Sequence, residues 1–521
     1  MRKGKRLWAL LTAVAVMLCG CALRPNEQEK SNEIALPEPA REAQNMFLGE
    51  QRAAGAANVT LYFPASDGAG FSTITRSIRA QSGGELLEAA VNALLSTRPG
   101  SESMALPTND TRLLGCEYAC GTVTVNLSID ARNVQTPQEL LALETAIGNT
   151  LLGIKGVAGV NVLIGDQSEG FWQLPMGVQT ETIASVTASY AQLQAERERL
   201  LVEDAMPVAR KALVYFPTND GSWLVPELRD VVFRTSDFAS ALIELLQSGP
   251  LDKSCAVSSI PEGVELLNGG PSIDTLSTGE RVLSLNFSAA LANYLAFSGL
   301  EVWELVGSIA LTTCSFLPEI DAVRILVNSE PITICELGDT IVNFPDGLIR
   351  RDDFSGRIGS AVTLYLVDES GVLQPVKRAI FTGSAYSPRS LLVKLFSYSG
   401  EGRALRFPVS QNIYPEDLLG VQVSEGIARI NLSAGFYRSC QTLMPDDERN
   451  LIYAMVNTLC QLEDVRAVRF YVEGLAADTL AGDIYLKSLL MPNPGIVATA
   501  QAVSLEGAPL ATEAPLATLV P

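Results

Sequence analysis

One short apolar segment occurs three times in the chain, as Val59-Thr60-Leu61-Tyr62-Phe63-Pro64, Ala212-Leu213-Val214-Tyr215-Phe216-Pro217 and Val362-Thr363-Leu364-Tyr365-Leu366-Val367. Segments of this length that are rich in β-branched and aromatic residues are typical of buried strands. The tyrosines lie 153 and then 150 residues apart. A period of that size is too long for a solenoid repeat, so it predicts whole domains that have been duplicated.

The same succession of elements follows each strand. An amphipathic stretch comes first, at residues 86–95, 239–246 and 391–396. A predicted hairpin then closes on Asn-x-Ser, at residues 126–128, 286–288 and 431–433, where such side chains usually satisfy a turn or cap a helix. A longer helix and a final strand complete the unit. The sequence therefore predicts an α+β fold of three β-α-β-β-α-β modules, with the helices packed on one face of a small mixed sheet.

The offsets within the repeats agree closely. Ten residues before the equivalent valines Val160, Val323 and Val468 stand three threonines, which we take as equivalent helix positions: Thr150, Thr313 and Thr458. In the first long helix, apolar residues recur at three- and four-residue steps and form one stripe that should face the core.

The tyrosine strand, the Asn-Leu-Ser strand end and the helix motif Asn149-Thr150-Leu151 resemble the GerMN domain family, a sporulation and spore-germination module. The resemblance covers residues 58–170, 211–332 and 361–480, and the second copy departs from it at Leu311-Thr312-Thr313. The resemblance implies a lipoprotein or other envelope protein of a Gram-positive bacterium that acts in sporulation, germination or the assembly of envelope complexes. No enzymatic activity is established for the module.

The N-terminus has the pattern of a secretory signal peptide. Four basic residues precede an apolar run from Leu7 to Leu18, which is too short to span a bilayer comfortably. The sequence Leu18-Cys19-Gly20-Cys21 resembles a lipobox, which implies cleavage after residue 20 and a lipid on Cys21; an ordinary signal peptide is the alternative. We therefore expect an extracytoplasmic protein that is anchored to the outer face of the cell membrane through Cys21.

Four segments lie outside the modules. Residues 21–57 are predicted to form a flexible tether, and residues 333–360 join the second and third modules. Residues 171–210 are predicted to form a helical linker, either a spacer or pairing helix or a helix packed on a neighbouring domain. Residues 481–521 are rich in Ala, Pro and Thr toward the end and are predicted to form a disordered tail.

Composition narrows the function. The chain of 521 residues has a formal net charge of −20 and no histidine. The acidic balance argues against binding of nucleic acid, and the lack of histidine removes the commonest general base and transition-metal ligand. Gly153, Gly156 and Gly159 follow a helix, in the wrong order for a phosphate-binding loop, and Asp446-Asp447-Glu448 lack calcium-loop spacing and suit a helix N-terminus. We expect no enzyme activity, no cofactor and no metal site.

Seven cysteines remain beyond Cys19 and Cys21. Cys116 and Cys120 flank a predicted hairpin turn, and a disulfide between them is feasible outside the cell. Buried free thiols that pack as small apolar side chains are the alternative.

The interpretation that best fits these features is a non-enzymatic scaffold or binding lipoprotein, with envelope proteins or cell wall as its partners and the membrane contacted through the lipid. A peptidoglycan-directed enzyme would instead need converging carboxyl groups with raised pKa values. A small-ligand-binding lipoprotein would need a deep cleft between two copies. The identity of the partner and the oligomeric state do not follow from the sequence.

Overall fold

The computed structural model describes residues 48–52, 54–104, 106, 110–202, 206–385, 387–398, 406–408 and 413–498. The predicted signal peptide, Cys21 and most of the predicted tether lie outside these residues. In the described part of the chain, no helix is both long enough and apolar enough to cross a bilayer.

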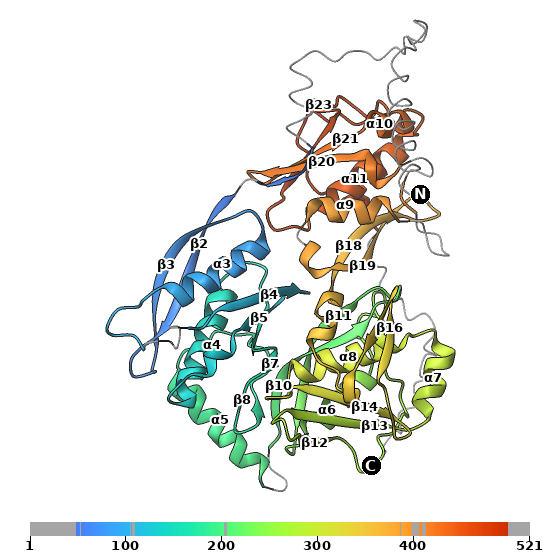
Figure 1. Ribbon diagram of the computed structural model, residues 1–521. Helices are drawn as coiled ribbons and strands as arrows, with labels where there is room; N and C mark the ends of the chain where they lie inside the picture. The colour runs from blue at the N-terminus through green and yellow to red at the C-terminus, as the bar shows by residue number, and fades with distance from the viewer. Residues whose placement is uncertain are drawn as a thin grey trace, which may run out of the picture.

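Three modules with one order of elements make up the chain: a long hairpin, a helix, a second hairpin, a long helix and a final hairpin (Figure 1). Module 1 contains β2 (Gly55–Pro64), β3 (Phe71–Ala80), α3 (Gly83–Ser96), β4 (Leu113–Ala119), β5 (Thr122–Leu127), α4 (Pro137–Leu152), β6 (Gly159–Ile164) and β7 (Gln167–Ser168). Module 2 contains β10 (Val208–Pro217), β11 (Leu224–Phe233), α6 (Phe238–Gln247), β12 (Ser272–Thr275), β13 (Arg281–Phe287), α8 (Val302–Cys314), β14 (Ala322–Val327) and β15 (Glu330–Pro331). Module 3 contains β18 (Gly359–Val367), β19 (Leu373–Phe381), α9 (Pro388–Phe396), β20 (Leu418–Ser424), β21 (Ile427–Leu432), α11 (Pro445–Leu459), β22 (Ala467–Val472) and β23 (Leu475–Ala476).

Short helices before the long helices differ among the copies. They are η1 (Ile129–Arg132) in module 1, α7 (Ala290–Ser298) in module 2 and α10 (Ala434–Cys440) in module 3. The segments between modules carry β8 (Gly170–Phe171), β9 (Leu174–Pro175), α5 (Val186–Leu200), β16 (Ile334–Leu337), β17 (Thr340–Asn343), η2 (Pro345–Gly347) and η3 (Asp352–Arg357).

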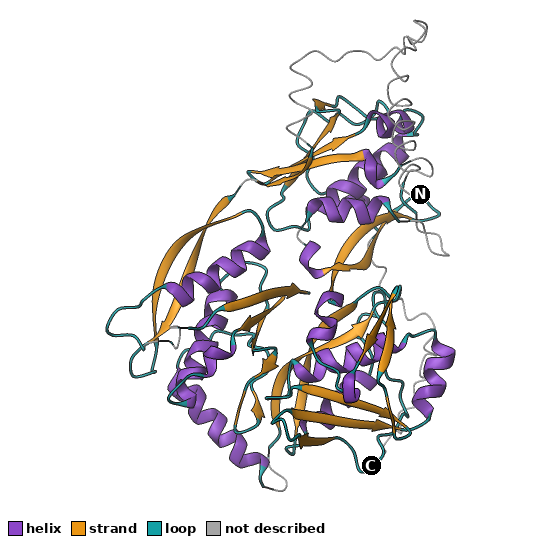
Figure 2. Cartoon of the chain, in the orientation of Figure 1, coloured by secondary structure: helices purple, strands orange, loops and turns teal. Residues whose placement is uncertain are grey.

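Each module holds a two-stranded sheet and a mixed sheet. In module 1 the mixed sheet has the order β4-β5-β6-β7, with β4 antiparallel and β6 parallel to β5, and α4 makes the crossover between the parallel strands. Modules 2 and 3 repeat this order with β12-β13-β14-β15 and β20-β21-β22-β23. The α+β class is confirmed, and Figure 2 shows helices and strands interspersed within each module.

The predicted β-α-β-β-α-β pattern lacks two strands per module, one of which is the two-residue last strand: β7, β15 or β23. The tyrosine strand pairs antiparallel with a second strand that the sequence analysis missed: β3, β11 or β19. The missed strand of module 1, β3, is mostly half-buried or exposed and carries polar residues such as Thr73 and Arg76. Because neither face of β3 is deeply buried, its sequence shows no apolar alternation.

One hydrogen bond joins the tyrosine strand to the long helix in every module. The amide of Tyr62 donates to Thr150 Oγ1 at 3.1 Å, and the amide of Tyr365 donates to Thr458 Oγ1 at 3.3 Å. In module 2 the amide of Tyr215 donates to Thr312 Oγ1 at 3.0 Å. The predicted equivalence of Thr313 is therefore wrong by one residue, because the stretch from the hydrogen-bonded threonine to the equivalent valine is one residue longer in module 2 than in the other copies.

The modules pack into two hydrophobic cores. Modules 1 and 2 share a continuous core, whereas module 3 has its own. Helix α5 packs against α4 and buries Leu193, and Tyr190 lies 5.3 Å from Trp172 between ring centroids. The segment 171–210 thus contains a helix packed on a neighbouring domain, as one of the two interpretations predicted.

Both ends of the described chain are held in module 3. Residues Gly49–Arg52, predicted as part of the flexible tether, form β1, which pairs in parallel with β20. Within the predicted tail, Leu486 is buried and Val497 forms a bridge with Leu373. The prediction of a flexible tether up to residue 57 is therefore wrong for residues 49–52 and for residues 55–57, which begin β2. The prediction of a disordered tail from residue 481 is wrong for residues 481–498. Residues 499–521 lie outside the described part.

Candidate functional site at the junctions between modules

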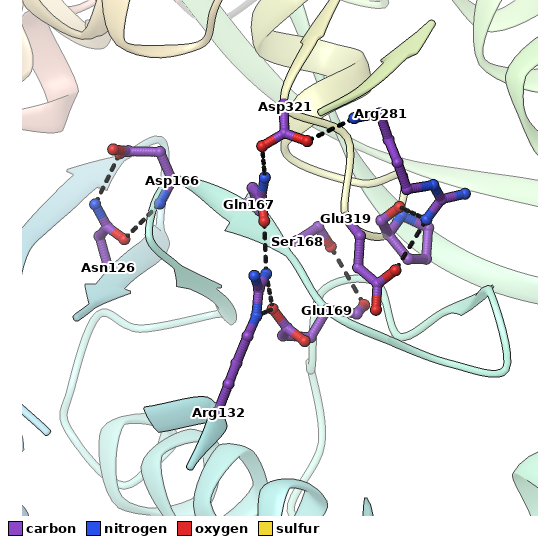
Figure 3. Close-up of polar contacts among 10 residues, drawn as sticks. Asn126, Arg132, Asp166, Gln167, Ser168, Glu169, Arg281, Glu319 and Asp321 are labelled. Carbon is purple, nitrogen blue, oxygen red and sulfur yellow. Dashed lines mark hydrogen bonds and ion pairs between the residues drawn. The ribbon is translucent and has the colours of Figure 1, made fainter. Parts of the chain in front are cut away.

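A polar network fixes module 2 against module 1 (Figure 3). The amide of Glu319 donates to the carbonyl oxygen of Ser168 at 2.9 Å, and Ser168 forms a parallel bridge with Pro318. Next to this bridge, Gln167 Nε2 donates to a carboxylate oxygen of Asp321. Asp321 also accepts the amide of Arg281 at 2.7 Å, so the end of β7 is tied to the start of β13.

The network continues into module 1 through Arg132. Its Nη2 donates to Gln167 Oε1 at 2.7 Å, and its Nε donates to Glu169 Oε1 at 2.7 Å. Because Arg132 belongs to η1 and Glu169 follows β7, the ion pair holds the last hairpin of module 1 against the turn before α4. The junction is therefore fixed in orientation by directional contacts as well as by apolar packing.

A buried arginine joins modules 1 and 2 to the linker between modules 2 and 3 (residues 333–360). Arg351 is 3% exposed, and its Nη2 lies 2.6 Å from Glu117 Oε2 while its Nε donates to Ser315 Oγ at 3.1 Å. Burial alone would lower the pKa of the guanidinium, but the carboxylate of Glu117 more than offsets this, and the pKa is raised. The cation stays charged where β4, the end of α8 and the second linker meet.

Module 3 contacts the other two through polar groups. The amide of Cys120 donates to Ser360 Oγ at 3.2 Å, and the hydroxyl of Thr382 in η4 (Thr382–Ser384) donates to the carbonyl oxygen of Tyr118. Lys377 Nζ lies 2.5 Å from a carboxylate oxygen of Asp252 in module 2. Together with the pairing of β1 and β20, these contacts hold module 3 against the C-terminal end of β4.

A small cavity is lined by the most perturbed carboxyl group. The cavity measures about 110 Å³ and is lined by Glu144, Thr145, Asn161 and Glu169, among others. Glu144 is 8% exposed; burial, and secondarily the charge of Glu169, raises its pKa well above the usual value. Such a volume holds a few waters, whereas ligand pockets typically measure ~300–1,000 Å³. The pair of carboxyl groups therefore lacks room for a sugar substrate.

Two larger hollows lie where modules and linkers meet. A cleft of about 840 Å³ runs between α3, β4, β1 and the segment around η4. A second cleft of about 410 Å³ lies between the linker segment 171–210 and module 2 and is lined in part by Trp172, Arg197, Phe238 and Ile273. Both have the size of binding sites, and both depend on how the modules are joined.

Comparison with known families decides the relationship of the chain. A family model described as "Germane: Sporulation and spore germination" matches residues 60–170, 213–333 and 363–478, about two thirds of the chain. The chain belongs to the Germane family. Each matched region starts in a tyrosine strand and ends near the last hairpin of a module, so the predicted threefold resemblance is confirmed. The family connects the chain with sporulation and spore germination.

Three solved structures are similar to parts of this Germane chain. The tandem GerMN domains of the sporulation protein GerM from Bacillus subtilis are 16% identical, cover 55% of this chain and 99% of their own, and have a TM-score of 0.23. A putative lipoprotein from Clostridium perfringens is 16% identical over 26% of this chain and 87% of its own (TM-score 0.18). The first GerMN domain of GerM is 17% identical over 25% and 96% (TM-score 0.21). No curated protein matches the chain.

The repeated asparagine of the Germane modules is structural. Asn126 Nδ2 donates to Asp166 Oδ1 at 2.8 Å and its Oδ1 accepts the Asp166 amide, which closes the turn after β6. Asn286 accepts the amide of Ser329 at 2.9 Å, and Asn431 accepts the amide of Gly474 at 2.8 Å. The prediction that these side chains satisfy turns is confirmed.

The cysteines of the first Germane module are not bonded to each other. Cys116 lies in β4 and Cys120 in the turn that follows, and both are free, so the suggested disulfide is absent. Burial, helped by the charges of Glu88 and Glu117, raises the pKa of Cys116 to about 12. Thiols with raised pKa values are poor nucleophiles, which is consistent with a packing role.

One acidic residue of the predicted helix cap has a stronger role than the sequence indicated. Glu448 in the first turn of α11 is fully buried, and its carboxylate accepts four backbone N–H groups. The donors are Leu480 at 2.9 Å, Ala481 at 2.7 Å, Asp483 at 2.8 Å and Ile484 at 3.3 Å. The segment after module 3 is thus anchored by a charge that the sequence pattern assigned only to the helix N-terminus.

Metal ligands do not gather in the described part of the chain: no group of three or more His, Cys, Asp or Glu there could hold an ion. The sequence does not reveal that Arg351 and Glu448 hold separate segments of the chain together, because their hydrogen-bond partners lie far away in sequence.

Proposed function

We propose that this Germane chain is a non-catalytic scaffold lipoprotein of the cell envelope that acts in sporulation or spore germination. The observation that carries the proposal is the set of polar junctions, among them the buried Arg351–Glu117 pair, through which the three modules contact one another. Tandem modules that are held in register can engage a partner at several points, which gains affinity without new contacts.

The anchor completes the proposal. A lipid on Cys21 would hold the chain at the outer face of the membrane, with the modules as the extracytoplasmic part. Replacing Cys21 with alanine should move the protein from the membrane fraction to the soluble or culture fraction, measured by fractionation and immunoblotting. Unchanged membrane association of the Cys21→Ala chain would count against this anchor.

Photo-cross-linking in living cells tests the scaffold function. A cross-linking residue is placed at Leu114, which is 58% exposed on β4, or, as a control, at Phe297, which is 90% exposed on α7. Membranes from sporulating and from growing cells are then analysed by mass spectrometry. We expect one envelope protein to be cross-linked at Leu114 and not at Phe297. Failure to recover any envelope protein under either condition would contradict the proposal.

Capture of a small ligand is the second candidate, because a cleft of about 410 Å³ with aromatic lining lies between the linker segment 171–210 and module 2. Soaking the protein with cell-wall fragments and following Trp172 fluorescence would test it. A saturable change that is lost on replacement of Arg197 would favour this candidate over the scaffold.

A further inference from the structure

The chain itself shows how its mixed sheets accept an additional strand. In module 3, β1 lies beside the edge strand β20 in parallel, with Glu50 opposite Val421 and Arg52 opposite Val423. The edge strand of this sheet has an irregular register between Leu418 and Gly420, which is the mark of a β-bulge. The added strand comes from outside the module, so the edge is a binding site that is already occupied within the chain.

Module 1 presents the same edge, and no strand of the described residues pairs with it. Strand β4 occupies the place of β20 in the sheet order, and it has the same register shift, between Leu113 and Gly115. Cys116 therefore corresponds to Val421. Open edges present rows of backbone N–H and C=O groups, and natural proteins usually cover them.

The contacts at the end of β4 show which way this edge faces. The carbonyl oxygen of Tyr118 points away from β5, since it accepts the hydroxyl of Thr382 in module 3. Outward-facing residues alternate along an antiparallel edge strand, so the backbone of Cys116 points to the same side. Module 3 contacts the last residues of β4, and Cys116, Glu117 and Tyr118 border the cleft.

The cleft beside β4 is large enough to be a binding site and is net acidic. It measures about 840 Å³, and Cys116, Glu117 and Tyr118 contribute to its wall. Side chains that carry full charges are four carboxylates and one guanidinium: Glu50, Glu85, Glu88, Glu117 and Arg52. Glu117 is paired with Arg351 and Glu50 lies 3.7 Å from Arg52, so Glu85 and Glu88 leave the cleft net acidic.

The corresponding edge of module 2 is a poorer candidate. Strand β12 has four residues, all exposed, whereas β4 has seven. The cleft next to it takes most of its wall from other segments and includes only Ile273 of β12.

We propose that the edge of β4 binds an extended segment of a partner protein that carries lysine or arginine, as an added strand of the module 1 sheet. Main-chain hydrogen bonds to Cys116 hold the segment, and Glu85 and Glu88 at the start of α3 bind its basic side chains. This inference rests on the proposed scaffold function and names the chemistry of one partner site.

A peptide assay tests the inference directly. The probe is a blocked hexapeptide of alternating lysine and valine, added to the full mature protein in non-ionic detergent and followed by calorimetry. Two control peptides are used: the same sequence with alternate backbone nitrogens methylated, which keeps the charge but removes donors, and a glutamate–valine peptide. Hydrogen exchange of the Cys116 amide is measured with and without the probe.

We expect the lysine–valine peptide to bind and to slow exchange at Cys116, and neither control peptide to do so. Glu88→Lys should weaken binding about tenfold, since it replaces one partly shielded attraction with a repulsion. Glu198→Lys is the matched control, because Glu198 is also an exposed helical glutamate but lies on α5, and it should leave binding within about twofold. Circular dichroism verifies that both variants fold.

Four results would overturn the inference. Equal binding of the methylated peptide would show that the strand edge is not used. Equal loss in Glu88→Lys and Glu198→Lys would show general attraction to an acidic protein. Concentration-dependent dimers of the protein alone that Glu88→Lys disperses would assign the edge to a second copy. An envelope partner that still cross-links while the peptide does not bind would refute this site and leave the scaffold function standing.

Discussion

Replacing Thr312 with valine should destabilise module 2, whereas the same change at the neighbouring Thr313 should not. The two residues are adjacent, fully buried and chemically identical. Thr312 Oγ1 accepts the amide of Tyr215, so this hydroxyl is the acceptor that the amide would lose in the variant. Thr313 instead donates to the carbonyl oxygen of Ile309 at 2.8 Å, four residues earlier in its own helix.

The expected magnitudes follow from these partners. Valine has nearly the shape of threonine, so neither change leaves a cavity. Thr312→Val leaves the Tyr215 amide buried without an acceptor, which costs about 1–3 kcal/mol. Thr313→Val removes a hydroxyl whose acceptor keeps its helical hydrogen bond, so we expect a change below about 0.5 kcal/mol.

Hydrogen exchange is the suitable assay, because unfolding of a multidomain chain is not a two-state reaction. Loss of about 1–3 kcal/mol should speed exchange of the Tyr215 amide about 5- to 150-fold in Thr312→Val, with little change in Thr313→Val. Thr150→Val and Thr458→Val should do the same to Tyr62 and Tyr365, each in its own module only. Equal effects of the two substitutions in α8 would refute the assigned register and, with it, the equivalence of the three copies.

Three further predictions concern the junctions, the cavity and the cysteines. Arg351→Met leaves the half-buried carboxylate of Glu117 without its partner, so it should destabilise the chain by about 3 kcal/mol. Calorimetry should show this as a lower temperature of the first unfolding transition. An unchanged transition temperature would contradict a structural role of the pair. Because burial raises the pKa of Glu144, the folded state holds a proton that the unfolded state releases above about pH 4.5, so the free energy of unfolding should fall as the pH rises above that value. Glu144→Gln should flatten this dependence of stability on pH. An unchanged dependence in the variant would exclude Glu144 as its source. Burial raises the pKa of Cys314 to about 12 and that of Cys255 to about 11, so both should resist iodoacetamide at pH 8 until the protein is unfolded, as counted by mass spectrometry; rapid labelling of the native protein would show that these thiols are accessible.

The elements that bury an apolar stripe could be predicted from the sequence. The tyrosine strands and the long helices repeat apolar residues at fixed steps, and so they were placed correctly. Strand β3 was missed because its residues are largely solvent-exposed and show no alternation. The equivalence of Thr313 failed because counting back from Val323 assumes connections of equal length, and only the hydrogen bond of Thr312 reveals the extra residue.

The junctions between modules were beyond the reach of pattern analysis. Glu117 and Arg351 are separated by 234 residues, and nothing in either local sequence indicates the other. Likewise, residues 49–52 resemble a tether because a four-residue edge strand with two charged residues has no signature of its own. Contacts of this kind depend on how complete modules dock, which is decided by surfaces that form only after folding.

The claim that the chain works by binding and not by catalysis is tested most directly at Glu144, the carboxyl group with the most strongly perturbed environment. A strain that lacks the chain is supplied with wild-type protein or with Glu144→Gln, which mimics the protonated carboxyl, and spore formation and germination are scored. We predict full restoration by Glu144→Gln. A folded, correctly localised Glu144→Gln protein that fails to restore function would contradict the account, because it would show that proton transfer at this position is required.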